Sequence, residues 1–216
     1  MRAVLVASGD PHPDDGRWLE GADLIVAVDA GAAWLVQHAV RPHALVGDLD
    51  SVDAELVRSL AAAGVAIERH PIDKDQSDTE LAIAFARSKG ADEITVLGAF
   101  GGSRLDHEIA NLILLSGSAG SGVRLVHGES QVTALHGDDE RQLAGPDGSL
   151  VSLFAAGGDA LGVTTSGLEY PLRDETLLTG SSRGLSNVIL TRPASVRLRR
   201  GTLLVVEQPE DGDEPT

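Results

Sequence analysis

The sequence predicts two domains: an α/β domain with a mostly parallel sheet, followed by an all-β sandwich. Up to about residue 122, short β-branched apolar runs alternate with helix-length amphipathic patterns, which is typical of βαβ units. From residue 123, short alternating strands follow one another with Gly, Asp and Pro turns, and no helix-length pattern interrupts them. We therefore expect an α/β domain at 1–122, a β sandwich at 123–207 and an acidic disordered tail at 208–216.

In the first domain, apolar runs predict strands and 3.6-residue periodicity predicts helices. The expected strands are AVLVA (3–7), LIVAV (24–28), ALVG (44–47) and ITVLG (94–98), and the expected helices are 32–39, 54–64, a segment from Ser77, and 107–115. Ser77 stands three residues before Glu80, which matches a capping box, so the third helix should begin at Asp78. In the last helix we expect Ile109, Leu112 and Ile113 to form the buried stripe.

The second domain begins after the Ser/Gly-rich linker SGSAGSG (116–122). Its expected strands are 124–128, 131–137, 149–155, 162–172, 187–191 and 195–207. Several short strands in succession indicate an antiparallel sandwich or a barrel-like unit.

Composition excludes several classes of function. Seventeen basic and 33 acidic residues give a formal charge of −16, which argues against nucleic acid as a partner. A phosphorylated ligand would need a metal ion between its own charge and that of the protein. There is no cysteine, so disulfides, zinc thiolate sites and cysteine nucleophiles are excluded. The N-terminal apolar run is too short for a signal peptide or a membrane span, so we expect a cytoplasmic protein without a membrane partner.

Acidic residues follow two of the predicted strands. Asp29 comes after 24–28, and Asp48 and Asp50 come after 44–47. In an open α/β sheet, ligands bind beyond the carboxyl ends of the strands. The alternating D-x-D spacing should place Asp48 and Asp50 on one side of an extended segment, where they can share a hard cation. The alternative for each is a helix cap, and for the pair we favour the metal.

The stretch DKDQSD adds a third acidic group at the start of a helix. The helix dipole accounts for one acid there, but not for Asp73, Asp75 and Asp78 together. Lys74, one of two lysines in the chain, could be simple charge balance or a point charge that reaches a transferring phosphate. An acidic cluster with one embedded cation suits a divalent ion and a phosphate together.

A glycine-rich turn, LGAFGGSRLDHEIANL (97–112), joins a predicted strand to a predicted helix. Backbone amides around Gly101 and Gly102 could approach an anion at the start of that helix. Arg104 could clamp phosphate oxygens, and His107 with Asn111 lies on one helical face suited to a nucleotide. The alternative is that Asp106 or Ser103 caps the helix and His107 is merely exposed.

Four ordered motifs together resemble the thiamine pyrophosphokinase family. They are DAGA (29–32), GDLDS (47–51), DKDQSDTELA (73–82) and GGSRLDHEIAN (101–111). In the second half, VSLFA (151–155), VTTSGLEYPL (163–172) and RGLSN (183–187) look like the thiamine-binding β domain of that family. The resemblance spans about residues 2–206, and the ordered set is far more specific than any one motif.

The resemblance implies an enzyme that transfers the terminal pyrophosphate of ATP to the hydroxyethyl group of thiamine and releases AMP. It implies an ATP-binding catalytic α/β domain, a thiamine-binding sandwich, Mg²⁺, and a homodimer with sites between subunits. By motif match, the metal ligands would be Asp29, Asp48, Asp50 and Asp78. Asp78, Asp50 and Lys74 would be catalytic. ATP would be bound by Arg104, Asp106, His107, Asn111, Gly101, Gly102, Ser51 and Asp73, and thiamine by Gly184, Leu185, Ser186 and Asn187.

The chain departs from the common family pattern at three points. It has DAGAA where DGGAN is common, and GGSRLDH is one residue longer than the common GGR-x-DH. After Phe100 the only aromatic residues are Phe154 and Tyr170, so few rings are available to stack on thiamine. Three other functions stay open: a metal-dependent phosphoesterase, a non-catalytic protein that binds thiamine phosphate or a nucleotide, and a transferase acting on a different alcohol.

Overall fold

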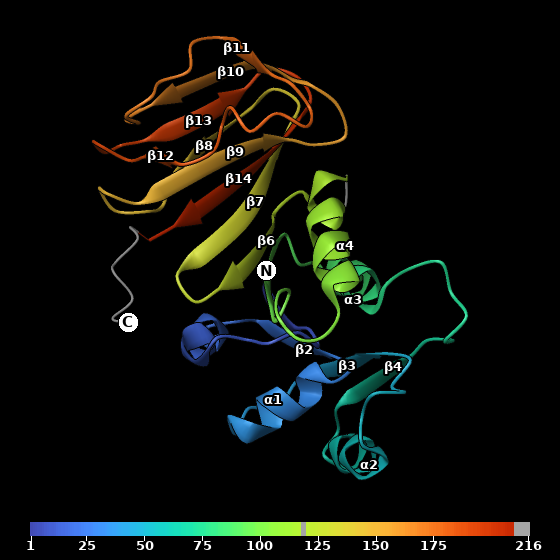
Figure 1. Cartoon of the computed structure of the whole chain (residues 1–216). Helices are drawn as coiled ribbons and strands as arrows, with labels where there is room; N and C mark the ends of the chain where they lie inside the picture. Colours follow the sequence, from blue (N-terminus) through green and yellow to red (C-terminus); the bar gives the residue numbers. More distant parts are fainter. Residues whose placement is uncertain (118–119, 210–216) are drawn as a thin grey trace. The chain divides into compact units, whose positions relative to one another are not determined.

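The computed structural model describes residues 1–117 and 120–209, and the chain divides into two compact units (Figure 1). The first unit comprises Met1–Leu114 and Gly122–Gly128, and the second comprises the described parts of Leu115–Ser121 and Glu129–Thr216. The strand at 123–127, which we expected in the β domain, thus belongs to the first unit. The predicted disordered tail lies outside the described residues from 210 onward, and Gln208 still belongs to the last strand.

The first unit is an α/β fold. Its strands are β1 (Arg2–Val6), β2 (Leu24–Val28), β3 (Ala44–Gly47), β4 (Ala66–Arg69), β5 (Glu93–Leu97) and β6 (Val123–His127). Its helices are the 3₁₀ helix η1 (Pro13–Leu19), α1 (Gly31–Gln37), α2 (Ala54–Ala62), α3 (Asp78–Ser88) and α4 (Leu105–Ser116). The strands pair in parallel in the order β6-β5-β1-β2-β3-β4. The predicted parallel sheet is confirmed.

The strand order locates the site. From β1 the chain winds through β2 and β3 to β4 on one side, and then through β5 to β6 on the other. The direction of winding therefore reverses between β1 and β5, and the crevice beyond the carboxyl ends of strands at such a switch point is where open α/β sheets bind ligands. Fully buried side chains such as Val4, Leu35 and Leu45 hold the sheet and α1 together beneath it.

The second unit is an antiparallel β sandwich. Its strands are β7 (Ser130–His136), β8 (Asp139–Gln142), β9 (Leu150–Ala155), β10 (Ala160–Ser166), β11 (Glu175–Leu177), β12 (Asn187–Val188), β13 (Ser195–Leu198) and β14 (Thr202–Gln208). One layer has the order β12-β9-β14-β7 and the other β11-β10-β13-β8. Leu153 and Val205 from the first layer and Val163 and Val196 from the second belong to one buried core. The predicted sandwich is confirmed.

The buried stripe predicted for α4 is wrong. Ile109 is 50% exposed and Ile113 is 63% exposed, and Leu105 continues the same exposed face at 67%. Leu112 is only partly buried. The buried positions of this helix are Asn111 and Leu115, and the side chain of Asn111 turns inward to the backbone carbonyl of Ala99. No helix within the described residues is long and apolar enough to cross a membrane.

Candidate active site

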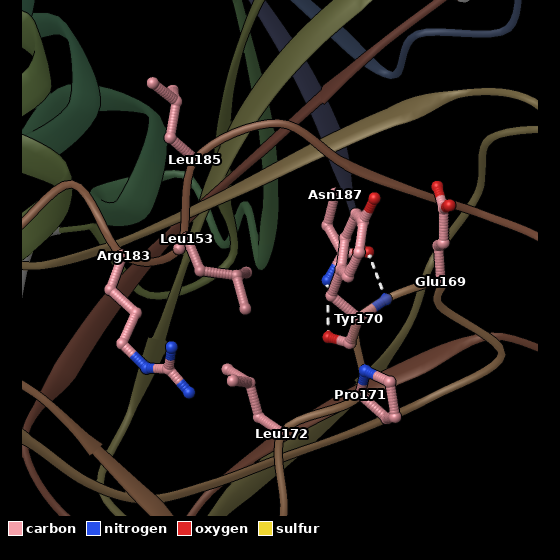
Figure 2. Close-up of a pocket in the computed structure, with 9 residues that line it drawn as sticks. Leu153, Glu169, Tyr170, Pro171, Leu172, Arg183, Leu185 and Asn187 are labelled. Carbon is pink, nitrogen blue, oxygen red and sulfur yellow. Dashed lines mark hydrogen bonds between the residues drawn. The ribbon is translucent and has the colours of Figure 1, made fainter.

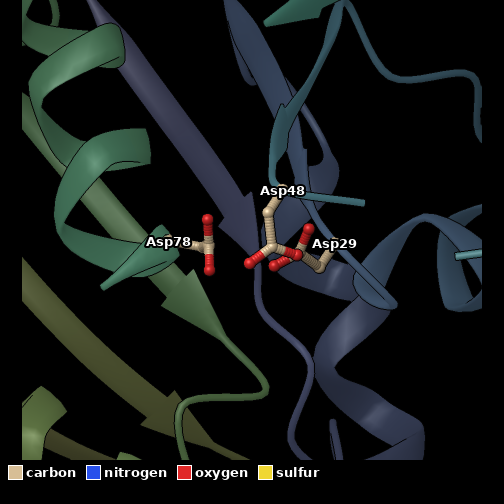
Figure 3. Close-up of side chains that lie close together, drawn as sticks. All are labelled: Asp29, Asp48 and Asp78. Atoms are coloured by element: carbon tan, nitrogen blue, oxygen red, sulfur yellow. The ribbon is translucent and has the colours of Figure 1, made fainter. Parts of the chain in front are cut away.

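Three carboxylates meet beyond the strand ends of the first unit. Asp29, Asp48 and Asp78 each offer an oxygen, and these oxygens lie within 4.8 Å of one another. Figure 3 shows the three side chains converging from three different segments of the chain. Asp29 is buried, and the other two are partly buried. Oxygen donors at this spacing are the ligands that a hard divalent cation requires.

The backbone around Asp29 is built for this convergence. Asp29 follows β2 directly and has a φ of 44°, a left-handed conformation that few residues other than glycine adopt. Its Oδ1 accepts a hydrogen bond of 3.0 Å from the amide of Leu49. A Cβ at Gly47 would lie 1.9 Å from that same Oδ1, so only glycine fits there. The glycine at the end of β3 is thus required by the position of the Asp29 side chain.

Asp48 and Asp50 do not form the extended D-x-D segment that the sequence predicted. Leu49 has a φ of 66°, which turns the chain between the two acids. The amide of Asp50 folds back and donates a hydrogen bond of 3.1 Å to Oδ1 of Asp48. Asp48 consequently joins the cluster with Asp29 and Asp78, whereas Asp50 is exposed beside it.

Asp78 is placed by the first turn of α3. The hydroxyl of Ser77 accepts a hydrogen bond of 3.2 Å from the amide of Glu80, so the predicted N-cap is confirmed. Lys74 lies four residues earlier, in the loop before α3, and its Nζ lies 3.0 Å from Oδ1 of Asp78 and 3.1 Å from Oδ2 of Asp48. Oδ1 of Asp78 is buried and accepts no hydrogen bond from the described residues, so this ammonium group provides its charge compensation.

The electrostatics of the cluster are those of crowded carboxylates around one cation. Burial, followed by the nearby charges of Asp78 and Asp48, raises the pKa of Asp29 to about 7. The amide of Asp50 and the ammonium group of Lys74 lower the pKa of Asp48. Partial burial acts to lower the pKa of Lys74, but its contacts with Asp78 and Asp48 outweigh that effect and raise it. A divalent ion would relieve the repulsion that raises the pKa of Asp29.

The cluster opens into a cavity of about 700 Å³. Its lining includes nearly all the site residues that the sequence predicted in the first half of the chain, namely Asp29, Asp48, Asp50, Ser51, Lys74, Asp78, Gly101, Gly102, Arg104, Asp106, His107 and Asn111. Asp73 is exposed and is absent from the lining.

One wall of the cavity is a glycine-rich contact between the β1 and β5 loops. The amides of Gly9 and Asp10 donate to the carbonyls of Gly98 and Phe100 at 2.9 and 2.8 Å. A Cβ at Gly9 would lie 2.4 Å from both of those carbonyl oxygens, so the two loops could not approach so closely with a larger residue. Sequence reasoning missed Ser8 and Gly9, which line the cavity. The glycine two residues after the first predicted strand was the available signal.

The side chains after the glycine turn are already engaged with the protein itself. Arg104 makes a bidentate ion pair with Asp106, which lowers the pKa of Asp106 to about 2. The amide group of Asn111 donates to the carbonyl of Ala99 at 2.8 Å. Glu108, also missed in the sequence, accepts a hydrogen bond of 3.2 Å from the amide of Gly101. His107 is exposed on the cavity wall. Asn111 and Glu108 therefore shape the turn.

The second unit has its own pocket, with a volume of about 420 Å³ (Figure 2). Among the predicted substrate residues, Gly184, Leu185 and Asn187 line it. Ser186 is not part of the lining, and its amide donates a hydrogen bond of 3.0 Å to the hydroxyl of Ser152. Tyr170, which is 63% exposed, supplies an aromatic ring at this pocket.

Asn187 fixes the position of Tyr170. Its Nδ2 donates to the carbonyl of Tyr170 at 2.8 Å, and its Oδ1 accepts from the amide of Tyr170 at 3.0 Å. The same Oδ1 accepts from the amide of Val188 at 2.9 Å. Figure 2 shows both bonds between Asn187 and Tyr170. The side-chain amide of Asn187 thus holds one wall of the pocket in place.

Comparison with known proteins gives a consistent result for both halves of the chain. The family model "Thiamin pyrophosphokinase, catalytic domain" matches residues 16–127, and "Thiamin pyrophosphokinase, vitamin B1 binding domain" matches residues 136–203. The thiamine pyrophosphokinase of Bacillus subtilis is 25% identical over 211 residues, covering 95% of this chain and 98% of that protein. The crystal structure of the Geobacillus thermodenitrificans thiamin pyrophosphokinase is 26% identical with a TM-score of 0.83, covering 98% of this chain and 99% of that one. The Candida albicans enzyme shares the fold at 15% identity, with a TM-score of 0.81 over 97% of this chain and 89% of that one.

Proposed function

The chain belongs to the thiamin pyrophosphokinase family, and on that premise we propose that it transfers the terminal pyrophosphate of ATP to the hydroxyethyl group of thiamine in a Mg²⁺-dependent reaction. The products are thiamine diphosphate and AMP. The observation that carries this proposal is the meeting of Asp29, Asp48 and Asp78 within 4.8 Å in the lining of a cavity of about 700 Å³. A protein with a formal charge of −16 needs such a cation site to accept a triphosphate.

The donor set fits Mg²⁺. The three clustered carboxylates are hard oxygen ligands, one of them with a pKa raised by burial and crowding and another with a buried oxygen that lacks a hydrogen bond. Asp50 lines the same cavity, and we retain it as a proposed fourth ligand. When bound, Mg²⁺ supplies positive charge to the phosphate oxygens that gain charge during transfer.

The reaction requires the thiamine hydroxyl oxygen to form a bond to the β-phosphorus of ATP. The bond from that phosphorus to the oxygen bridging the α-phosphorus breaks, AMP carries away the electron pair, and the hydroxyl proton passes to water. Asp78 sits at the tip of α3 beside the cluster, and we propose that it mainly orients the hydroxyl, since a carboxylate near a divalent ion is a weak base. Lys74 would neutralise a transferring phosphate oxygen.

ATP would lie along the glycine turn. The amides of Gly101 and Gly102 precede α4, and both glycines line the cavity beside Ser51, Arg104 and His107. Arg104 would exchange its exposed pairing with Asp106 for a phosphate, and a swap between exposed partners is inexpensive. In this proposal Asn111 holds the glycine turn in place through its bond to the carbonyl of Ala99. Asp73 does not line the cavity, and its proposed role in nucleotide binding is exerted from the exposed loop before α3.

The pocket of the second unit supports a thiamine site. Its lining combines Leu153, Leu172 and Leu185 with the ring of Tyr170 and the ion-paired Arg183. Apolar walls with a few polar groups are typical of small-molecule sites. We propose that Gly184, Leu185 and Asn187 form the site, with Ser186 setting the bend of the segment through its φ of 56°.

We also propose that the protein is a homodimer located in the cytoplasm. The exposed apolar stripe of Leu105, Ile109 and Ile113 on α4 supports an association surface. The absence of cysteine is in keeping with a reducing compartment. Sedimentation velocity, with Ile109→Glu compared with the unchanged chain, tests the surface: the variant should sediment as a monomer.

One assay tests the proposed reaction. Purified protein with ATP, Mg²⁺ and thiamine should yield AMP and thiamine diphosphate in equal amounts. Formation of ADP would instead indicate a simple kinase, and formation of free phosphate a phosphoesterase. Binding of thiamine phosphate without turnover would indicate a non-catalytic binding protein, and turnover only with other alcohols a related transferase.

A further inference from the structure

Lys74 occupies the position in which a cation is needed. Its Nζ lies 3.1 Å from Oδ2 of Asp48 and 3.0 Å from Oδ1 of Asp78. The three side chains are only 14%, 12% and 20% exposed, so water screens this arrangement weakly. The single positive charge of the ammonium group is therefore shared between two of the three carboxylates shown in Figure 3.

A metal ion and the Lys74 ammonium group compete for the same oxygens. Mg²⁺ binds carboxylate oxygens at about 2.0–2.1 Å, which would place it within a few ångströms of Nζ if the lysine stayed where it is. Two positive centres so close together in a partly buried site repel each other strongly. Occupation of the cluster by a divalent ion thus requires Lys74 to leave at least one of its partners.

We propose that the Lys74 ammonium group competes with the metal ion for the acidic cluster. In the free protein Lys74 stabilises the cluster, and when the ion binds, its side chain moves into the ligand cavity. The inference rests on the proposed function, because it takes the cluster to be the metal site. The cavity of about 700 Å³ can accommodate the displaced side chain, because Lys74 lines it together with Ser51 and Gln76.

The competition couples the metal to the nucleotide. A polyphosphate in the cavity offers the released ammonium group new anionic partners, so it removes the competitor and strengthens metal binding. By thermodynamic reciprocity, the metal then strengthens polyphosphate binding by the same factor. The free protein would hold Mg²⁺ weakly, and the complex with ATP would hold it tightly.

The lysine content of the chain permits a direct test. Lys74 and Lys89 are the only lysines, and Lys89 lies at the end of α3 over the ring of Phe85. Reductive ¹³C-methylation keeps the positive charge and gives one NMR signal for each lysine in addition to that of the N-terminus. Titration with Mg²⁺ and the unreactive α,β-methylene analogue of ATP should shift the Lys74 signal and leave the Lys89 signal in place.

A matched pair of variants measures the competition. Lys74→Met and Lys89→Met change the net charge equally and keep an apolar stem. Without nucleotide, Lys74→Met should bind Mn²⁺ about tenfold more tightly than the unchanged protein or more, and Lys89→Met should equal it. With the analogue at saturating concentration, Lys74→Met and the unchanged protein should bind Mn²⁺ with equal affinity.

The outcomes separate this inference from the function on which it rests. If the unchanged protein binds Mn²⁺ but the Lys74 signal stays fixed, or if Lys74→Met binds Mn²⁺ no more tightly, the competition is refuted and the metal site stands. If the unchanged protein binds no Mn²⁺ even with the analogue, the metal part of the proposed function fails, and the inference fails with it. Circular dichroism checks that both variants are folded, and the NMR titration needs no variant.

Discussion

The amide of Leu49 donates a hydrogen bond of 3.0 Å to Oδ1 of Asp29, which ties the loop after β3 to the loop after β2. The bond orients a buried carboxylate by the backbone alone, before any ligand is present. Sites whose groups are held in place in advance lose little free energy to reorganisation when they bind and react.

Asp29→Asn should separate the structural role of this side chain from its charge. Asparagine can still accept the hydrogen bond from Leu49 through its own Oδ1, so at a pH well below 7, where Asp29 is itself protonated, the variant should unfold near the temperature of the unchanged protein. The lost charge should reduce Mn²⁺ affinity and lower kcat by about 100-fold or more, as expected for a lost electrostatic contact to the transition state. Isothermal titration calorimetry and the AMP assay measure the two effects, and unchanged Mn²⁺ affinity would remove Asp29 from the metal site.

The stability of the metal-free protein should depend on pH through Asp29. Its folded-state pKa is raised to about 7 from 3.8, so between about pH 4 and 7 the folded chain keeps a proton that the unfolded chain releases. This contribution to stability is fully present below about pH 4, falls as pH rises, and is gone above pH 7. In urea unfolding in EDTA at pH 5, 6, 7 and 8, the free energy of unfolding of the unchanged protein should fall relative to that of Asp29→Asn by at most about 1.4 kcal/mol per pH unit up to about pH 7, which leaves the variant the more stable protein. A free energy of unfolding of the unchanged protein that stays constant or rises with pH relative to that of Asp29→Asn contradicts the assignment.

Gly47→Ala should damage the site far more than a matched glycine substitution. The new Cβ would collide with the Asp29 carboxylate at 1.9 Å, whereas Gly64, which also has a positive φ, has no atom within 4 Å of the corresponding position. Both alanines strain the backbone by about 1–3 kcal/mol, but only Gly47→Ala should also abolish Mn²⁺ binding and turnover. Thermal unfolding and the AMP assay on the two variants distinguish strain from displacement of the carboxylate.

Asp50→Asn should abolish turnover while the fold survives. Asp50 is exposed and its amide, which the substitution retains, makes the hydrogen bond to Asp48. Circular dichroism should therefore be unchanged while formation of AMP is lost. Activity retained within a few-fold would take Asp50 out of the proposed metal shell and leave the ion to the three clustered acids.

Asn187→Asp should weaken the acceptor site selectively. The carboxylate cannot donate to the carbonyl of Tyr170, and the lost bond should reduce the free energy of unfolding by about 1–2 kcal/mol. With the segment of Tyr170 loosened, the KM for thiamine should rise at least severalfold while the KM for ATP stays constant. Steady-state kinetics in both substrates provide the check, and an equal rise in both KM values would mean general damage.

Strand positions made much of the fold and the cluster predictable from sequence. Asp29 and Asp48 follow apolar runs, Asp78 follows a recognisable cap, and the carboxyl ends of parallel strands share one edge of the sheet. These three are the acids that the structure brings together. The fold class was predicted from the change near residue 123, where alternating strand and helix patterns give way to strand patterns alone.

The remaining errors have local physical causes. The D-x-D argument assumed extended backbone, but Leu49 adopts φ of 66°, and a left-handed leucine has no signature in the sequence. The buried stripe of α4 was assigned by hydrophobicity, yet Asn111 is buried because its amide reaches the carbonyl of Ala99. The approach of Gly9 to Gly98 depends on which strands are neighbours, and periodicity alone cannot give that order.

Each acid of the cluster arrives from a separate segment, after β2, after β3 and at the start of α3. An ion bound by all three acids would act as a cross-link that exists only while the three segments keep their folded positions. No peptide cut from one of these segments would reproduce it. The supply of divalent ions around the protein would therefore help to determine how long it survives heat or a protease.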